Sequence, residues 1–285
     1  MEEIVRVKDL CFKYPDGTSL RFEGEDFAVR KGERVVMLGP NGSGKSTLLS
    51  LLLGLLGASG GEVDVMGVDP GKDYEKVRER IGALLQNPDL QIIAPKVWDD
   101  VSFSPRNYGY GKEKTDELVG DALKRLEIEH LKDKVPHYLS GGEKTKVALA
   151  GALVTKPELL ILDEPFEHID PMCRTEMIRL LNSVNHENGT AILLSTHNMN
   201  TVPLIADTVY LMAVGGRIVA KGTPKEVFSM TGALAECHIE PPVLGELFAE
   251  RKKLGVDLDP SLNVEDAALT IANHMLSSED KARHG

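Results

Sequence analysis

The sequence has few cysteines and no long apolar run. Its three cysteines, Cys11, Cys173 and Cys237, lie far apart along 285 residues. These spacings match neither a disulfide framework nor a zinc site, and they favour a reducing, cytosolic compartment. The richest apolar run, residues 48–56, has about half of the ~20 apolar residues that a membrane-spanning helix needs. We therefore expect any role at a membrane to depend on a partner protein.

Positive charge is also in short supply. The chain has 33 lysine and arginine residues against 44 aspartate and glutamate residues, which gives a formal net charge of −11. An acidic balance argues against a protein that coats nucleic acid, so we expect no nucleic-acid partner. With 42% hydrophobic and 27% charged residues, the composition suits one large or two modest globular domains with a sizeable core.

Glycine, in contrast, is concentrated in a motif that binds phosphate. Residues 39–47 read GPNGSGKST and fit the pattern G-x-x-x-x-G-K-[ST]. Such a loop holds phosphates with a concave run of backbone N–H groups, and glycine permits the necessary sharp turns. The apolar run 35–38 predicts a buried strand before the loop, and residues 46–56 predict a helix after it. The N-terminus of that helix would face the phosphates.

The polar side chains of this loop have separate predicted roles. We expect Lys45 to reach the β- and γ-phosphates of a nucleotide and Ser46 to bind Mg²⁺. Thr47 would support the nucleotide at its α- and β-phosphates. The alternative is a chance glycine-rich turn. The sequence of strand, glycine loop and helix argues against that alternative, because it is the context in which the motif functions.

A second motif ends a buried strand in two adjacent carboxylates. Residues 159–165 read LLILDEP. Burying two negative charges is costly unless a cation or phosphate chemistry uses them. At the strand end, Asp163 can hold Mg²⁺ through water, and Glu164 can orient or deprotonate an attacking water. A strand that ends in a solvated acidic turn is the ordinary alternative, and the phosphate loop elsewhere in the chain argues against it.

A third motif predicts a capped helix. Residues 139–143 read LSGGE. Ser140 is a good N-cap, and Glu143 three residues later would complete a capping box. Gly141 and Gly142 at the start of the helix would make an anion site. Taken alone, the motif indicates nothing more than an ordinary capped helix.

Together, in this order and spacing, the three motifs resemble those of the ATP-binding-cassette (ABC) ATPases, with LSGGE as the signature loop. The resemblance covers residues 4–228. It implies an α/β fold, that of a P-loop ABC ATPase, with a RecA-like parallel core sheet, an antiparallel β subdomain and a helical subdomain at about 87–156. We expect residues 1–228 to form this ATPase domain. Residues 229–285 would form a small helical C-terminal extension, either packed on the main body or used in an oligomer contact.

The resemblance adds three further residues to the expected site. Gln86 lies where the family has its Q-loop glutamine, which touches Mg²⁺ or the water and leads toward the membrane partner. His197 matches the switch histidine that contacts the γ-phosphate. Tyr14 matches the aromatic residue that stacks on adenine, although by itself such a tyrosine is more often part of a core.

The resemblance therefore implies an ATPase that uses ATP and Mg²⁺ and is built as a head-to-tail dimer. Each ATP would lie between the phosphate loop of one protomer and the signature loop of the other, and one chain carries both half-sites, so a homodimer suffices. The expected catalytic residues are Lys45, Glu164 and His197, and the expected metal-binding residues are Ser46, Gln86 and Asp163. The expected ATP-binding residues are Tyr14, Gly39, Pro40, Asn41, Gly42, Ser43, Gly44, Lys45, Ser46, Thr47, Gln86, Asp170 and, from the second protomer, Ser140, Gly141 and Gly142.

A narrower resemblance indicates importers of the energy-coupling-factor type. Residues 86–91 (QNPDLQ) and 97–105 (VWDDVSFSP) are similar to segments of that group, and residues 202–207 and 222–228 resemble its cobalt branch. This implies the ATPase subunit of a cobalt or nickel importer of the CbiO-like group, peripheral on the cytoplasmic face of the cell membrane. Its partners would be a transmembrane coupling (T) subunit and a membrane subunit that sets substrate specificity. Candidates for lining the docking groove, or alternatively the core of the helical subdomain, are Leu90, Ile92, Ile93 and Val97.

Two alternatives remain open at this point, and a third is disfavoured. The chain can be the shared motor of a vitamin importer, or one half of a heterodimeric pair. It can be a soluble cassette protein of translation or DNA repair, although those usually carry two cassettes or a long insertion. A regulatory module without turnover would be expected to lack Glu164 or His197, and both are present.

Several positions depart from the family pattern. Glu143 stands where glutamine is usual, Lys146 where arginine is common, and Phe166 where threonine or serine is usual. Residues 167–170 (EHID) form an unusual D-loop that keeps Asp170. We still expect an active ATPase, because the catalytic and metal-binding residues Lys45, Asp163, Glu164 and His197 are all retained.

Overall fold

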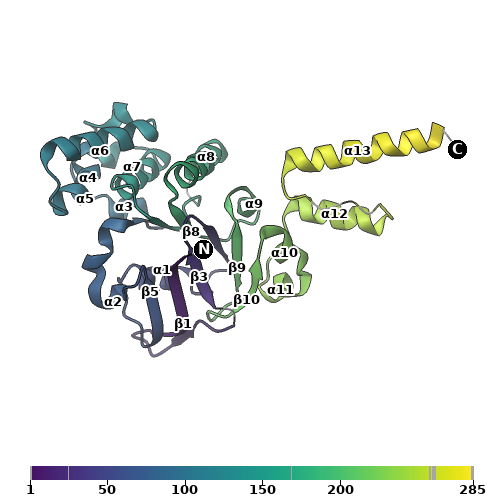
Figure 1. Ribbon diagram of the computed structural model, residues 1–285, viewed down its shortest axis with the longest axis horizontal. Coiled ribbons are helices and arrows are strands. Elements are labelled where there is room, and N and C mark those ends of the chain that lie inside the picture. The colour runs from purple at the N-terminus through teal and green to yellow at the C-terminus, as the bar shows by residue number, and fades with distance from the viewer. Residues whose placement is uncertain (1, 25, 168, 257, 259–260, 284–285) are drawn as a thin grey trace.

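The computed structural model describes residues 2–283, apart from residues 25, 168, 257, 259 and 260 (Figure 1). Two sheets with flanking helices form the main body, and two helices near the C-terminus extend away from it. Position 168 of the unusual D-loop lies outside the described residues.

The larger sheet has six strands in the order β10-β9-β4-β8-β7-β6. Five of them are parallel, and β10 pairs with β9 in the antiparallel sense at one edge. All residues of β7 and β8 are buried, which fits their apolar sequence, because parallel strands are covered on both faces. The strands are β4 (Arg34–Leu38), β6 (Ile81–Leu84), β7 (Leu159–Asp163), β8 (Ala191–Thr196), β9 (Thr208–Met212) and β10 (Ile218–Gly222).

The smaller sheet is antiparallel and lies at the N-terminal side of the chain. Its long strand β1 pairs with each of the other three strands. The buried and exposed residues of β1 largely alternate, as expected for a strand with one face toward the core. The strands are β1 (Glu3–Lys13), β2 (Ser19–Arg21), β3 (Phe27–Arg30) and β5 (Gly60–Val65). The predicted antiparallel and parallel layers are both present.

Two hydrophobic cores lie on opposite faces of the larger sheet. Val35 and Met37 of β4 belong to the core shared with the smaller sheet, while Val36 and Leu38 point into the other core. Helix α1 (Lys45–Leu52) packs in the first core through four buried leucines. It ends earlier than the predicted 46–56, because the chain turns at Gly54, whose φ is +66°. Strand β4, which precedes the phosphate loop, is therefore packed against a hydrophobic core on each face of the sheet.

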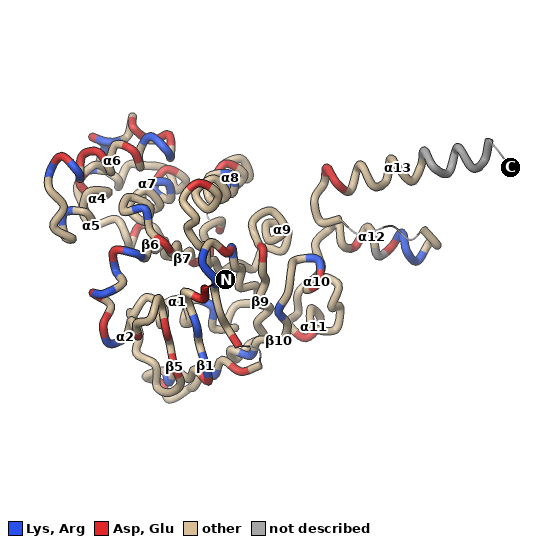
Figure 2. The backbone as a smooth tube through the Cα atoms, in the orientation of Figure 1, with Lys and Arg blue, Asp and Glu red and all other residues tan. Residues whose placement is uncertain are grey.

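The helices α3 to α7 lie together beside the larger sheet (Figure 1). They span residues 88–153 and fall within the range predicted for the helical subdomain, whose boundaries stay a prediction. The predicted apolar face of α6 is buried, and Figure 2 shows both acidic and basic residues along this helix. The helices are α3 (Pro88–Gln91), α4 (Val97–Val101), α5 (Phe103–Asn107), α6 (Lys112–Arg125) and α7 (Gly141–Leu153).

The other helices of the main body connect strands or cover their ends. Helix α8 runs alongside the second core, with its buried side chains packed there. These helices are α2 (Pro70–Asp73), α8 (Pro171–Asn188), α9 (Val202–Ile205), α10 (Pro224–Ser229) and α11 (Thr231–Glu236).

The C-terminal helices α12 (Val243–Lys253) and α13 (Val264–Arg283) project from the body as a hairpin (Figure 1). Phe248 and Ala267 are buried, but many apolar side chains of the hairpin are exposed, including Val243, Leu247, Leu254, Val264, Leu269 and Met275. The hairpin therefore does not lie flat on the main body. Within the described part of the chain, none of the helices has both the length and the apolar character needed to span a membrane.

Candidate functional site

The phosphate loop joins the end of β4 to the start of α1, as the motif predicts. Gly44 precedes the helix in the left-handed region, with φ of +87°, which favours glycine. Gly39 faces a different constraint, because a Cβ there would lie 2.5 Å from the carbonyl oxygen of Met212. The two glycines thus allow the turn and the close approach of neighbouring backbone.

The interior of the loop contains polar groups that suit a phosphate. The hydroxyl of Ser43 is fully buried and has no hydrogen-bond partner among the described residues. Lys45 is only 5% exposed, and its Nζ donates to the carbonyl oxygens of Gly39 at 2.7 Å and Pro40 at 3.2 Å. A buried hydroxyl without a partner is costly, and a phosphate oxygen would supply one. The loop therefore fits the phosphates of ATP.

Two carboxylates at the end of β7 face this lysine. Asp163 and Glu164 are 9% and 8% exposed. Oε1 of Glu164 lies 3.7 Å from Nζ of Lys45. Burial lowers the pKa of Lys45, and the charges of Glu164 and Asp163 oppose that shift. Lys45 is thus the cation that compensates two nearly buried negative charges.

The next parallel strand adds two residues to the same edge of the sheet. His197 follows β8, and its Nδ1 lies 3.1 Å from Oε2 of Glu164. Ser195, inside β8, donates from Oγ to Oδ1 of Asp163 at 2.5 Å and accepts from the Glu164 N–H at 2.9 Å. The carboxyl ends of parallel strands meet at one edge, and this is where such sheets bind ligands. The sequence predicted His197 but not Ser195. A polar residue within a buried apolar strand could have indicated that Ser195 belongs to the site.

Gln86 lies just beyond β6 and is held by a residue that the sequence analysis did not single out. Its side-chain Nε2 donates to Oε2 of Glu167 at 2.8 Å. Glu167 also contributes to the electrostatic environment of Lys45. The unusual D-loop thus places a third carboxylate near the phosphate loop and ties it to the Q-loop glutamine.

Tyr14 is connected to the phosphate loop through its hydroxyl group. Its Oη lies 2.6 Å from Oγ1 of Thr47, and its ring packs edge-on against Phe12 with centroids 4.9 Å apart. The tyrosine therefore links the end of β1 to α1. Its stacking on adenine stays a prediction.

The signature loop is organised by the predicted capping box. Oγ of Ser140 accepts from the Glu143 N–H at 3.3 Å, and Oε2 of Glu143 accepts from the Ser140 N–H at 2.8 Å. Hydrogen bonds from the backbone and then the hydroxyl of Ser140 lower the pKa of Glu143. Glutamate in place of the usual glutamine therefore serves the cap well.

Asp170 caps the neighbouring helix α8. Its Oδ1 accepts from the N–H groups of Met172 at 2.9 Å and Cys173 at 3.0 Å. The signature loop packs against this helix start, because a Cβ on Gly142 would lie 3.6 Å from Sγ of Cys173. Ser140, Gly141 and Asp170 are exposed. The departure at position 166 is structural, since Phe166 is buried in the second core.

The candidate docking residues divide between the surface and the core. Leu90 and Ile93 are 77% and 64% exposed, and Ile93 lines a cavity of about 240 Å³ together with Phe103 and Tyr108. Ile92 is partly buried. For Val97 the second of the two predicted alternatives holds, because it is fully buried in the helical core and does not line a groove.

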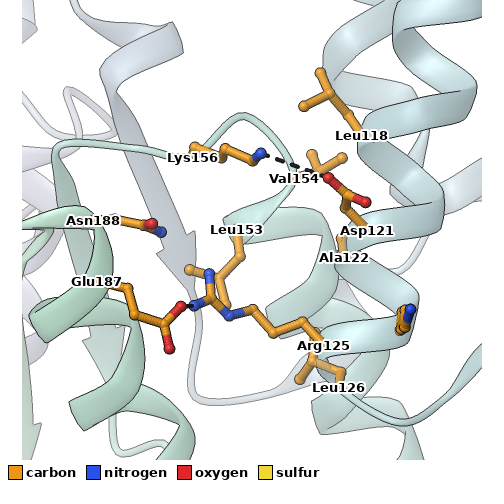
Figure 3. A pocket seen from close by; sticks show the side chains of 11 residues that line it. Leu118, Asp121, Ala122, Arg125, Leu126, Leu153, Val154, Lys156, Glu187 and Asn188 are labelled. Atoms are coloured by element: carbon orange, nitrogen blue, oxygen red, sulfur yellow. Dashed lines mark hydrogen bonds and ion pairs between the residues drawn. The ribbon is translucent and has the colours of Figure 1, made fainter.

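A second cavity, of about 540 Å³, lies between α6, the end of α7 and the end of α8 (Figure 3). Two ion pairs line it, Arg125 with Glu187 and Lys156 with Asp121 at 3.6 Å. None of the residues predicted for the nucleotide site lines it. Four of its charged residues are thus already engaged in ion pairs.

Comparison with known proteins decides the family. A model of the ABC transporter family matches residues 22–167, a range that contains the phosphate loop, the signature loop and the Asp–Glu strand. The chain belongs to the ABC transporter ATP-binding proteins. The ABC ATPase fold and the expected activity, ATP hydrolysis coupled to transport, are confirmed.

Relatives of this ABC ATPase narrow the type of transporter. The chain is 41% identical to the energy-coupling factor transporter ATP-binding protein EcfA of Methanocaldococcus jannaschii, over 95% of this chain and 98% of the relative. It is 39% identical to EcfA of Methanococcus maripaludis, over 90% and 93% of the two chains. The chain is therefore an ATP-binding subunit of an energy-coupling-factor type ABC transporter.

A solved structure is also similar to most of this chain. It is that of CbiO1 from Clostridium perfringens, described as part of the ABC transporter complex CbiONQ. The TM-score is 0.73 with 38% sequence identity, and the match covers 87% of this chain and 100% of the other.

Proposed function

We propose that this ABC ATPase is the motor subunit of an energy-coupling-factor importer for cobalt or nickel ions. The cobalt-branch resemblance of residues 202–207 and 222–228 supports this substrate, as does the similarity to CbiO1. The second candidate is the shared ATPase of a vitamin importer. The similarity to EcfA supports this candidate equally well, because that name specifies no substrate. A soluble cassette protein is no longer a candidate, given the transporter relatives.

The observation that carries the proposed site is the meeting of four side chains at one sheet edge. Lys45 begins α1 after the phosphate loop, Asp163 ends β7 and Glu164 follows it, and His197 follows β8. Lys45 would exchange its bonds to the loop carbonyls for bonds to the phosphates of ATP. Glu164 would accept a proton from the attacking water, and His197, held by Glu164, would contact the γ-phosphate.

The metal-binding residues also fit their proposed ion. Ser46, Gln86 and Asp163 offer oxygen atoms, which are the ligands that Mg²⁺ prefers. When bound, Mg²⁺ would neutralise charge on the phosphates of ATP. Ser46 is exposed beside the buried end of the loop, and Asp163 is fixed by Ser195. The protein contributes the placement of these oxygen atoms.

A second protomer would complete each site. Ser140, Gly141 and Asp170 are exposed, and the signature helix begins with N–H groups that suit an anion. We propose a head-to-tail homodimer in which Ser140, Gly141 and Gly142 of one copy meet the ATP held by the other.

The apolar surface around Leu90 and Ile93 would receive the transmembrane coupling subunit, which would place the ATPase peripherally on the cytoplasmic membrane face.

Two experiments test this proposal. The purified chain should hydrolyse ATP only with Mg²⁺, and Glu164→Gln should bind ATP and form a dimer in light scattering without turnover. If ATP hydrolysis did not depend on Mg²⁺ and Glu164→Gln still turned over ATP, the proposed site would be wrong.

Gentle purification of the tagged chain from its native membranes, followed by mass spectrometry, tests the proposed substrate. Cobalt- or nickel-permease subunits with one ATPase species support the proposal, while a vitamin-binding subunit or a second ATPase supports the alternative.

A further inference from the structure

Ser195 joins the two strands that carry the catalytic edge of the sheet. It lies in β8, directly opposite Asp163 of β7 in the parallel register. Its side chain is completely buried. A buried hydroxyl in a largely apolar strand needs hydrogen-bond partners, and its partners are Asp163 and Glu164, the two carboxylate residues of the proposed site.

One hydroxyl group makes both contacts. A serine oxygen can donate one hydrogen bond and accept others. Because the backbone N–H of Glu164 can only donate, Oγ of Ser195 accepts that bond, at 2.9 Å. Its own proton is then directed to Oδ1 of Asp163, at 2.5 Å. Such a short bond to a carboxylate belongs to the stronger class of hydrogen bonds.

The bond to Glu164 supports an unusual backbone conformation. Glu164 has a φ of +46°, in the left-handed region that non-glycine residues avoid. Such conformations persist where the surroundings hold them, and they are concentrated at active sites. Here the Ser195 hydroxyl holds the peptide N–H of that residue. The resulting turn directs the Glu164 carboxylate toward Lys45, 3.7 Å away, and His197, 3.1 Å away.

We propose that Ser195 is a positioning residue for both carboxylates of the ATPase site. By fixing one oxygen of Asp163, it orients the carboxylate whose other oxygen would hold Mg²⁺. By holding the Glu164 N–H, it sets the position of the carboxylate that would receive the proton of the water. This inference rests on the proposed roles of Asp163 and Glu164 and extends them to a residue that touches neither ATP nor metal.

The alternative is that Ser195 only satisfies buried polar groups. The chain offers a matched control for that role in Thr190, just before the same strand. Thr190 is also fully buried, and its Oγ1 donates to the carbonyl oxygen of Pro157 at 2.8 Å. It lies at the opposite end of β8 from His197. Loss of either hydroxyl should lower stability, but only Ser195 should affect the response to Mg²⁺.

The test measures the affinity of the full-length chain for a fluorescent, slowly hydrolysed ATP analogue, with Mg²⁺ and with EDTA. In Ser195→Ala we expect the affinity in EDTA to stay within about twofold of the native value. The gain in affinity that Mg²⁺ gives should fall about tenfold, as is typical when a group that orients a metal ligand is removed. Thr190→Val should keep the native gain. If Ser195→Ala also keeps it, or if Thr190→Val loses as much, the proposal is overturned.

Further variants separate this inference from the proposed function. Asp163→Asn should lose the Mg²⁺ gain by itself, and adding Ser195→Ala should then change little, because the two residues act as a unit. A normal gain in Asp163→Asn would overturn the metal role of Asp163, and this inference with it. A loss in Asp163→Asn beside a normal gain in Ser195→Ala would overturn the role of Ser195 alone. If Ser195→Ala does not fold, Ser195→Cys should give the same loss, since a thiol is a weak donor and acceptor.

Discussion

The phosphate-loop edge and the signature loop are built in opposite ways. At the first, Lys45, Asp163 and Glu164 are less than 10% exposed and contact one another or Ser195. At the second, Ser140 and Gly141 are exposed, and the hydrogen bonds of Ser140 close on Glu143 within the same helix turn.

This difference shows what each region needs from outside. Charges buried together must be placed by the fold itself, because an uncompensated charge there is costly. A capped helix start has no buried charge to compensate. It can therefore lie exposed on the surface, where its N–H groups are free to bind an anion. We infer that the phosphate-loop edge is organised before ATP arrives, while the signature loop depends on contact with the nucleotide of another copy.

The largest effect should come from the buried region. Glu164→Gln keeps the size of the side chain but removes the proton acceptor, so ATP turnover should fall about 10²–10⁴-fold. ATP affinity should change little, because the phosphate loop is untouched. Steady-state ATPase assays and equilibrium binding check the two halves of the prediction. Turnover at the native rate would mean that another residue accepts the proton.

A smaller effect is expected at the signature loop. Ser140→Ala removes an exposed polar group proposed to meet the ATP of the partner, and ATPase activity should fall about tenfold or more. ATP binding to the isolated chain should be unchanged. Thr223→Ala is the control, because Thr223 and Glu226 form an equivalent capping box on α10. Each substitution should cost about 1 kcal/mol of stability, so equal loss of activity in both variants would reduce the signature loop to a structural cap.

The third carboxylate of the phosphate-loop edge tests how charge acts there. Glu167→Gln keeps an acceptor for Gln86 but removes a negative charge near the phosphates. We expect ATP affinity to rise about two- to fivefold, the scale of one exposed charge interaction. Glu176→Gln, which affects a surface ion pair with Lys146, is the control. Weaker ATP binding in Glu167→Gln would indicate that the charge itself is needed.

The smallest effect concerns the pH response of the signature helix. Hydrogen bonds from Ser140 hold the pKa of Glu143 below its usual 4.5. A lowered folded-state pKa stabilises the protein above the unfolded value and loses this contribution as pH falls through the folded value. The native chain should thus melt above Glu143→Gln at neutral pH, and the difference should shrink below about pH 4.5. Glu226→Gln should behave alike, and a difference that grows in acid would contradict this sign.

Much of this architecture could be predicted from the sequence because it depends on local signals. The phosphate loop lies between a buried strand and a helix, and the capping box of Ser140 and Glu143 forms as the spacing predicts. Both features require only residues within a few positions of each other. The parallel strands could also be predicted from local sequence, because continuous apolar runs indicate strands that are buried on both faces.

The contacts that complete the site could not be predicted in this way. Ser195 is 32 residues from Asp163, and Glu167 is 81 residues from Gln86. Such pairs depend on strand order and register, which no local pattern specifies. The burial of Val97 also follows from tertiary packing, and no local pattern specifies the outward course of the C-terminal hairpin.

Mixing two variants of reduced activity tests most directly whether the two regions act in different copies. One variant carries Glu164→Gln and the other Ser140→Ala, and the ATPase activity of their mixture is compared with that of each alone. A site shared between copies predicts recovered activity, because one site of a mixed dimer combines an intact phosphate-loop edge with an intact signature loop. Activity no higher than the average of the two variants, with mixed dimers demonstrated by mass, would contradict the account.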